Sequence, residues 1–356
     1  MPEISLGGTK TLSALALSAF GGFLGTACHI PLAWMLGPLL VTACLSMSGV
    51  DLKFNPSLLR LGQLTIGTSV GLNMSTDVLI ELVSWLPLIV FSAFFSIIMS
   101  CFAGAFLAKH ARIDHTTAFF ASLPGGLAEM GNVGMRMGAQ SEPIAIVHTL
   151  RIALVVLVVP PILLALGSPD FATQPATQFI DLYWAPILVI GGAFVAYFFG
   201  VVHLNNPYMI GAVVFATIFA ANGLVAGKMP PMLFAAAQIL IGYSVGCRFR
   251  RSMLTHLPRV TLFSTFSILG LVVVMACYAL VVSCLSGLPY PAAILATSPG
   301  GTAEMVVTAQ VLHLAVPTVV GFQVVRGLLV NGLASYYFLL LRKSGLLDFL
   351  TRTIGG

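Results

Sequence analysis

Charged residues are scarce in this sequence. Asp, Glu, Lys and Arg make up 8% of its 356 residues, while hydrophobic residues make up 58%; about 25% charged residues is usual in soluble domains. This composition excludes an ordinary globular protein. Apolar stretches of about 20 residues recur instead along the chain. We therefore predict an all-α polytopic membrane protein whose main partner is the lipid bilayer.

Several sequence motifs of enzyme classes are also missing. The chain has no HExxH, Walker A or dinucleotide fingerprint, and its six cysteines show no CxxC or CxxH spacing. The pattern GxSxG occurs at 67–71 and 242–246, inside apolar segments, where we interpret its glycines as a helix-packing pattern. The seven histidines form no ligand-like cluster beyond His110 and His115. We predict no enzyme activity, cofactor or metal site, and we expect the cysteines to be small residues of the packed interior. The net charge of +5 comes from scattered loop residues, which argues against direct nucleic-acid binding.

One eight-residue motif occurs twice. LPGGLAEM at 123–130 returns 175 positions later as SPGGTAEM at 298–305, with six of the eight positions identical. Further matches at an offset of 174 or 175 pair 63–71 with 238–246, Arg151 with Arg326, and 34–37 with 208–211. They predict an internal duplication, with membrane repeats at 1–170 and 171–356 joined by the polar loop 167–181. Glycines at spacing four in the first of these matches favour close helix packing.

Each repeat contains six apolar segments. The twelve segments are 11–30, 32–50, 57–75, 85–109, 116–138, 142–166, 181–201, 207–227, 232–250, 258–286, 291–314 and 316–341. The basic loops fit the positive-inside rule if both motif-bearing segments return to the side from which they entered. Each repeat then has about five transmembrane helices plus one Pro-Gly-Gly re-entrant or broken helix, and the second repeat is inverted. A broken helix that crosses fully would leave a similar pattern.

The same charge distribution predicts sidedness. Both termini fall in the cytoplasm of a bacterial inner membrane, on the side of most Lys and Arg residues. The acidic loop that contains Asp77 and Glu81 falls outside.

The motif combines a helix breaker with residues that allow close approach of a ligand. Proline removes a backbone donor, and the two glycines let the chain turn. A helix that starts after each break would point its free N–H groups at the bilayer centre, where they suit an anion. The serines that flank the breaks either contact substrate or pack as small residues. The candidate substrate-binding residues are Ser122, Pro124, Gly125, Gly126, Ser298, Pro299, Gly300 and Gly301.

Each motif also places a carboxylate inside an apolar run. Glu129 and Glu304 would each cost about 2.5–3.5 kcal/mol at the centre of a span unless paired or hydrated. Arg151 and Arg326 follow 22 residues later in each repeat. Either each Glu–Arg pair is a structural ion pair, or the carboxylates carry a coupling proton or sodium ion while the arginines bind substrate. His148, three residues before Arg151 on the same helix face, is a candidate proton relay.

The paired motifs and the duplicated halves resemble the AbrB family of bacterial membrane proteins, whose members are named AbrB family transcriptional regulators or ammonia monooxygenases. Both copies of the motif, at 124–130 and 299–305, stand at the places the family leads one to expect, and the resemblance covers nearly the whole chain. It implies inverted repeats around a core of broken helices, similar to cation–proton antiporter and anion-transporter folds.

We expect secondary transport of a small anionic or zwitterionic metabolite coupled to protons or sodium. One alternative is a membrane-bound regulator or sensor that affects gene expression indirectly, through a soluble partner docked on the basic loop 248–259. A more distant alternative is the ammonia monooxygenase that the family name implies, although the sequence offers no matching cluster of copper-binding histidines. A homodimer is one assembly that the sequence permits.

Overall fold

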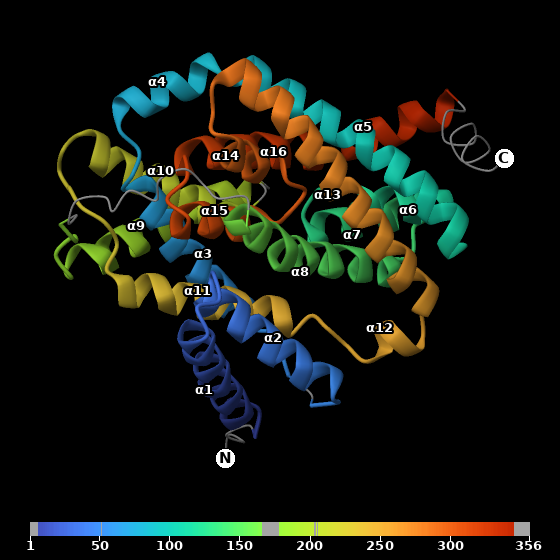
Figure 1. Ribbon diagram of the computed structural model, residues 1–356, viewed down its shortest axis with the longest axis horizontal. Helices are drawn as coiled ribbons and strands as arrows, with labels where there is room; N and C mark the ends of the chain where they lie inside the picture. The colour runs from blue at the N-terminus through green and yellow to red at the C-terminus, as the bar shows by residue number, and fades with distance from the viewer. Residues whose placement is uncertain (1–5, 51, 166–177, 203, 205, 345–356) are drawn as a thin grey trace. The chain divides into compact units, whose positions relative to one another are not determined.

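The computed structural model describes residues 6–50, 52–165, 178–202, 204 and 206–344 (Figure 1). Within these residues the chain forms sixteen helices and one isolated β-bridge, between Phe179 and Lys228. The all-α prediction is therefore confirmed. Most of the predicted joining loop at 167–181 lies outside the described residues, as do both ends of the chain.

The helices of the two sequence halves follow the same order. Those of the first half are α1 (Leu6–Ala27), α2 (Ala33–Met47), α3 (Pro56–Gly71), α4 (Thr76–Ser84), α5 (Leu86–Ala111), α6 (His115–Ser122), α7 (Leu127–Arg136) and α8 (Ser141–Ala165). Those of the second half are α9 (Trp184–Val201), α10 (Pro207–Ala221), α11 (Pro231–Gly246), α12 (Ser252–Thr255), α13 (Pro258–Ser286), α14 (Tyr290–Thr297), α15 (Thr302–Val311) and α16 (Val316–Lys343). Both bounds of α3, α6 and α7 recur 175 residues later, so the helices follow the spacing of the repeated motifs.

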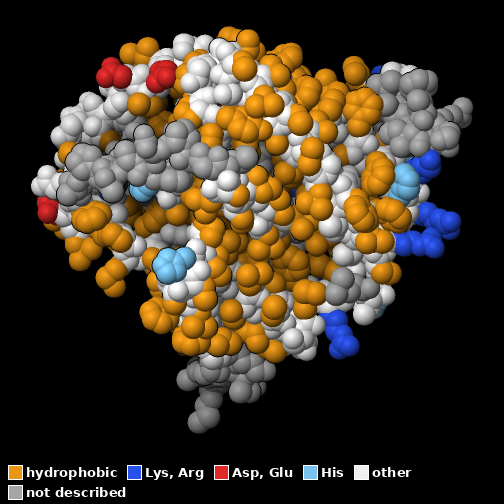
Figure 2. Space-filling model, in the orientation of Figure 1, with side chains coloured by type: hydrophobic (Ala, Val, Ile, Leu, Met, Phe, Trp, Pro, Cys, Tyr) orange, Lys and Arg blue, Asp and Glu red, His pale blue; other side chains and the backbone are white. Residues whose placement is uncertain are grey.

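Five of the helices are long and apolar enough to cross a membrane. They are α5, α8, α9, α13 and α16. Helices α2, α10 and α11 are apolar but have only 15 or 16 residues, which gives them a length of about 22–24 Å, less than the roughly 30 Å hydrocarbon core. Hydrophobic side chains dominate the visible surface (Figure 2). The chain has membrane-helix character, and the number of crossings stays a prediction.

The chain divides into two compact units, each of which draws on both sequence halves. The first unit contains α1 to α3 and α9 to α11. The second contains α5 to α7, α13, α14 and α16, and most of α8 and α15. The sequence repeats 1–170 and 171–356 are a different division of the chain, and they stay a prediction.

Glycines set the helix packing of the first unit. A Cβ added to Gly67 of α3 would lie 2.5 Å from the carbonyl oxygen of Met209 in α10. A Cβ added to Gly246 of α11 would lie 2.7 Å from the carbonyl oxygen of Leu39 in α2. The predicted packing role of these glycines is therefore confirmed, and each contact joins a helix of one half to a helix of the other.

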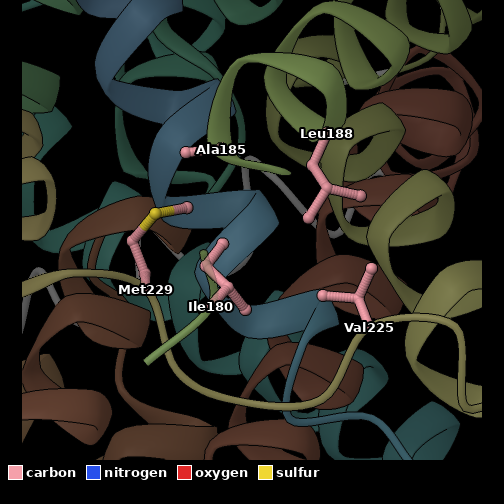
Figure 3. Close-up of a cluster of buried hydrophobic side chains, with 5 residues drawn as sticks. All are labelled: Ile180, Ala185, Leu188, Val225 and Met229. Carbon is pink, nitrogen blue, oxygen red and sulfur yellow. The ribbon is translucent and has the colours of Figure 1, made fainter. Parts of the chain in front are cut away.

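A cluster of buried hydrophobic side chains stabilises the start of α9 (Figure 3). Its members are Ile180, Ala185, Leu188, Val225 and Met229. The β-bridge lies beside the cluster: the Ile180 N–H donates to the Lys228 carbonyl oxygen at 3.0 Å, and the Lys228 N–H donates to that of Gln178 at 3.0 Å. These bonds tie the segment before α9 to the segment before α11.

Two expectations about particular residues were wrong. The acidic segment with Asp77 and Glu81 is not a loop but helix α4, because its apolar residues at 78, 79, 82 and 83 form one helix face. The cysteines do not all belong to the interior. A small thiol in a membrane helix can face lipid, so burial against protein is not required. Those with exposed side chains are Cys28, Cys44, Cys277 and Cys284.

Candidate functional site

Both copies of the motif interrupt a helix. Residues 123–126, which we name break 1, separate α6 from α7, and residues 298–301, which we name break 2, separate α14 from α15. The preceding helices end because Leu123 (φ −60°, ψ 135°) and Ser298 (φ −54°, ψ 137°) are extended. A residue before proline favours this backbone geometry. Both breaks belong to the second compact unit.

Break 1 is held by side chains from α8 and α16. Arg151 of α8 donates from Nη1 to the Leu123 carbonyl oxygen at 2.6 Å and from Nη2 to that of Gly125 at 3.1 Å. Asn331 of α16 accepts a hydrogen bond from the Gly126 N–H, with 3.1 Å between Oδ1 and the backbone nitrogen. The planar guanidinium fork satisfies carbonyl groups that lose their helical partners at the break.

Break 2 is held in the same way, and by one additional side chain. Arg326 of α16 donates from Nη1 to the Ser298 carbonyl oxygen and from Nη2 to that of Gly300, the latter at 2.9 Å. Arg326 Nη2 also donates to Oε1 of Gln323 at 2.7 Å. The Gln323 amide nitrogen in turn donates to the carbonyl oxygens of Leu295, Ala296 and Ser298, at 2.8, 3.4 and 3.2 Å. Donor and acceptor positions of both arginine clamps are related by the offset of 175.

The two arginines are buried. Arg151 is 3% exposed and Arg326 is 5% exposed. Their guanidinium groups bond to backbone carbonyls, and the pairing of each arginine with Glu129 or Glu304 stays a prediction. A buried positive charge beside each break favours a bound anion.

The two carboxylates differ in their surroundings. Glu304 is 7% exposed, and its carboxylate lies so close to Gly301 that an added Cβ there would clash with it. Glu129 is only partly buried. Both stand in the first turn of a ten-residue helix that follows a break, where the helix dipole favours negative charge.

The methionine that ends each motif packs so closely against the first glycine of the motif that a side chain there would not fit. Met130 and Met305 are both fully buried. A Cβ added to Gly125 would lie 2.9 Å from Met130 Cγ, and a Cβ added to Gly300 would lie 3.0 Å from Met305 Sδ. Glycine and methionine at this spacing therefore pack against each other, which gives part of the motif a structural role.

The predicted site residues all lie at the breaks or bind them, within the second unit. Ser122 and Ser298 are 6% and 3% exposed, and their hydroxyl oxygens have no hydrogen-bond partner in the described part of the chain. Ser122 lies beside Gly104 of α5, where an added Cβ would be 3.4 Å from its Oγ. This contact supports the packing interpretation for Ser122. Among the described residues, no group of three His, Cys, Asp or Glu side chains is placed to bind a metal.

Sequence reasoning missed Gln323 and Asn331. One signal was available for Gln323, which stands one helical turn before Arg326 just as His148 stands before Arg151. Asn331 has no such marker, because its counterpart at the offset of 175 is Val156.

In comparison with known proteins, one family model spans the whole candidate site. A family model described as "Transition state regulatory protein AbrB" matches residues 34–342, which include both breaks and both arginines. The chain is 28% identical to "Uncharacterized protein YhjN" of Bacillus subtilis (strain 168), over 93% of each chain. It is 26% identical to "Putative regulator AbrB" of Escherichia coli (strain K12), over 92% of this chain and 93% of that protein. This chain belongs to the AbrB family.

Proposed function

We propose that this protein is a secondary transporter of a small anionic or zwitterionic metabolite, coupled to protons or sodium. The observation that carries the proposal is the pair of helix breaks in one compact unit, each held by a buried arginine. Discontinuous helices whose N-termini point at a shared site are a recurring way for secondary transporters to bind anionic groups.

The proposal includes the path of the chain through the membrane. After α7, the Gln140 N–H donates to Thr117 Oγ1 at the start of α6, at 2.8 Å. The chain therefore leaves this segment close to the point at which it entered, which supports a re-entrant hairpin. With one hairpin and five crossings in each repeat, the second repeat is inverted, and both termini lie in the cytoplasm of a bacterial inner membrane.

A second candidate function is a membrane-bound regulator or sensor. It is favoured by the name of the Escherichia coli relative, "Putative regulator AbrB". The exposed side chains of Arg250 and Arg251 would offer a soluble partner a basic surface. Both candidates need a bound small molecule but no catalysis, and neither relative's name describes an enzyme.

Binding followed by flux separates the two candidates. Purified protein is screened for thermal stabilisation by small carboxylates and amino acids at several pH values, with and without sodium. Each compound that stabilises is then tested for uptake into proteoliposomes with an imposed ion gradient. Transport predicts gradient-driven uptake that Glu129→Gln abolishes while the variant still unfolds cooperatively. A compound that binds but does not cross, with binding insensitive to Glu129→Gln, would instead support the sensor.

A further inference from the structure

The two breaks share a backbone pattern but not the same support. At break 2, the Gln323 amide bonds to three carbonyl oxygens and to Arg326. At the equivalent position of α8 stands His148, whose buried ring bonds through Nδ1 to the Ile144 carbonyl oxygen of its own helix, at 3.0 Å. A side-chain amide that fastens α14 to α16 is thus replaced at break 1 by an imidazole.

The carboxylates at the two breaks also differ, because the one at break 2 is more tightly packed. The carboxylate of Glu304 is packed against Gly301, so it covers break 2 and faces the N-terminus of α15. The side chain of Glu129, its counterpart, is only partly buried. Movement of Glu304 would require break 2 to open, whereas Glu129 can change partners with less rearrangement.

Asn331 accounts for this difference. Its Oδ1 accepts the hydrogen bond from the Gly126 N–H, and it lies 2.5 Å from where a Cβ on Gly125 would be. At break 1 a neutral amide thus lies beside the Gly126 N–H, and at break 2 the Glu304 carboxylate lies beside Gly301, the counterpart of Gly126. The counterpart of Asn331 is Val156, which is fully buried and has no polar atom to offer. Asn331 thus satisfies break 1 without using Glu129.

We propose that the two breaks have different roles in transport: break 2 is a fixed element in which Glu304 is structural, whereas Glu129 at break 1 exchanges the coupling cation, and Asn331 is the positioning residue that leaves Glu129 available. This inference rests on the proposed function and assigns one of its ion-coupling residues a structural role.

The elements around Glu129 contain one other carboxylate. Helix α7 packs against α6 and α16, and α8 binds the same break through Arg151. The charged and titratable side chains on these three helices are His115, Glu142, His148, Arg151, Arg326, Tyr336, Tyr337, Arg342 and Lys343. Glu142 is exposed in the first turn of α8, which makes Glu142→Gln a matched control for Glu129→Gln.

Carbodiimide labelling tests the assignment without a known substrate. Dicyclohexylcarbodiimide reacts with protonated carboxyl groups in apolar surroundings, and peptide mass spectrometry locates the adduct. In the purified full-length protein we expect labelling at Glu129, reduced several-fold by sodium chloride relative to choline chloride or by raised pH, and little at Glu304. In Asn331→Val, which copies Val156, Glu129 takes over the Gly126 N–H and its labelling falls. Preferential labelling of Glu304 would overturn the proposal.

Thermal unfolding gives a second, independent readout. Glu129→Gln should lose any sodium- or pH-dependent shift in unfolding temperature. Its unfolding temperature should otherwise stay within about 2 °C of wild type, because Glu129 is only partly buried and substitutions outside the packed core usually change stability little. Glu304→Gln should unfold several degrees lower in all conditions but keep the shift, and Glu142→Gln should behave as wild type. Equal effects of the Glu129 and Glu304 variants in both readouts would contradict the asymmetry even if transport is confirmed. If the wild-type protein shows neither an ion-dependent shift nor transport, the proposed ion coupling is wrong. A lower unfolding temperature for Glu304→Gln than for Glu129→Gln would still show that only Glu304 is structural.

Discussion

At the scale of single residues, the first glycine of each motif is required by its neighbours. A Cβ at Gly125 would lie 2.5 Å from Asn331 Oδ1 and 2.9 Å from Met130 Cγ. At Gly300 the nearest atoms belong only to the flexible side chain of Met305. The amide at break 1 is fixed by its bond to the Gly126 N–H, so it cannot move away without losing that bond.

We therefore predict that Gly125→Ala is more destabilising than Gly300→Ala. Overpacking costs typically about 1–3 kcal/mol, and Gly125→Ala should fall toward the upper end of that range. Gly131→Ala is the control, because nothing lies within 4 Å of its added Cβ in helix α7 and alanine there should be neutral or stabilising. Thermal unfolding of the three purified variants measures the order. Equal losses at Gly125 and Gly131 would show that the loss at Gly125 does not depend on contact with Asn331, and the argument from Asn331 would fail.

The sequence predicted the residues within the breaks better than the side chains that hold the breaks in place. Proline beside two glycines cannot continue a helix, so both breaks and the residues in them were predictable. Arg151 and Arg326 were found because a charge in an apolar run must be compensated, but an arginine can bind a carboxylate or a carbonyl equally well, and sequence does not say which. Gln323 and Asn331 are uncharged, and a lone amide in a membrane helix gives no comparable signal.

At the scale of helices, the spacing-four glycines predicted that packing is close but not which helices meet. The small face of α3 suits any neighbouring helix, and the structure pairs it with α10 of the other sequence half. Such pairing depends on the three-dimensional arrangement of the repeats, which a pattern within one helix does not contain. Helix α4 was missed for a different reason, because nine residues with two acids look like a loop unless their apolar face is counted.

We predict that Gly67→Ala and Gly242→Ala each destabilise the first unit. At Gly67 the added Cβ would lie 2.5 Å from the Met209 carbonyl oxygen, and at Gly242 it would overlap that of Met35. Backbone carbonyl oxygens within a helix cannot rotate away as a side chain can, so the helices must separate and lose contacts along their length. We expect losses of about 1–3 kcal/mol in each case. Gly200→Ala in α9 meets nothing within 4 Å, and a comparable loss of thermal stability in that variant would contradict the packing explanation.

At the scale of the whole molecule, the proposed inverted topology makes a prediction that local packing does not. If each broken segment is re-entrant, the two ends of a segment lie on one side of the membrane, and the two segments open to opposite sides. His115 and Gln140 flank the first segment and are exposed, and Gln140 contributes only its backbone to the bond with Thr117. Pro289 and Ala315 flank the second.

Single cysteines at these four positions, in a chain whose six native cysteines are replaced, report the side directly. We expect His115→Cys and Gln140→Cys to react with a membrane-impermeant maleimide only in inside-out vesicles, because the positive-inside rule places this segment toward the cytoplasm. Pro289→Cys and Ala315→Cys should react only in intact cells. Labelling of the two ends of one segment from opposite sides would mean that the broken helix crosses fully. The count of crossings in each repeat would then be even, and the two repeats would be parallel rather than inverted.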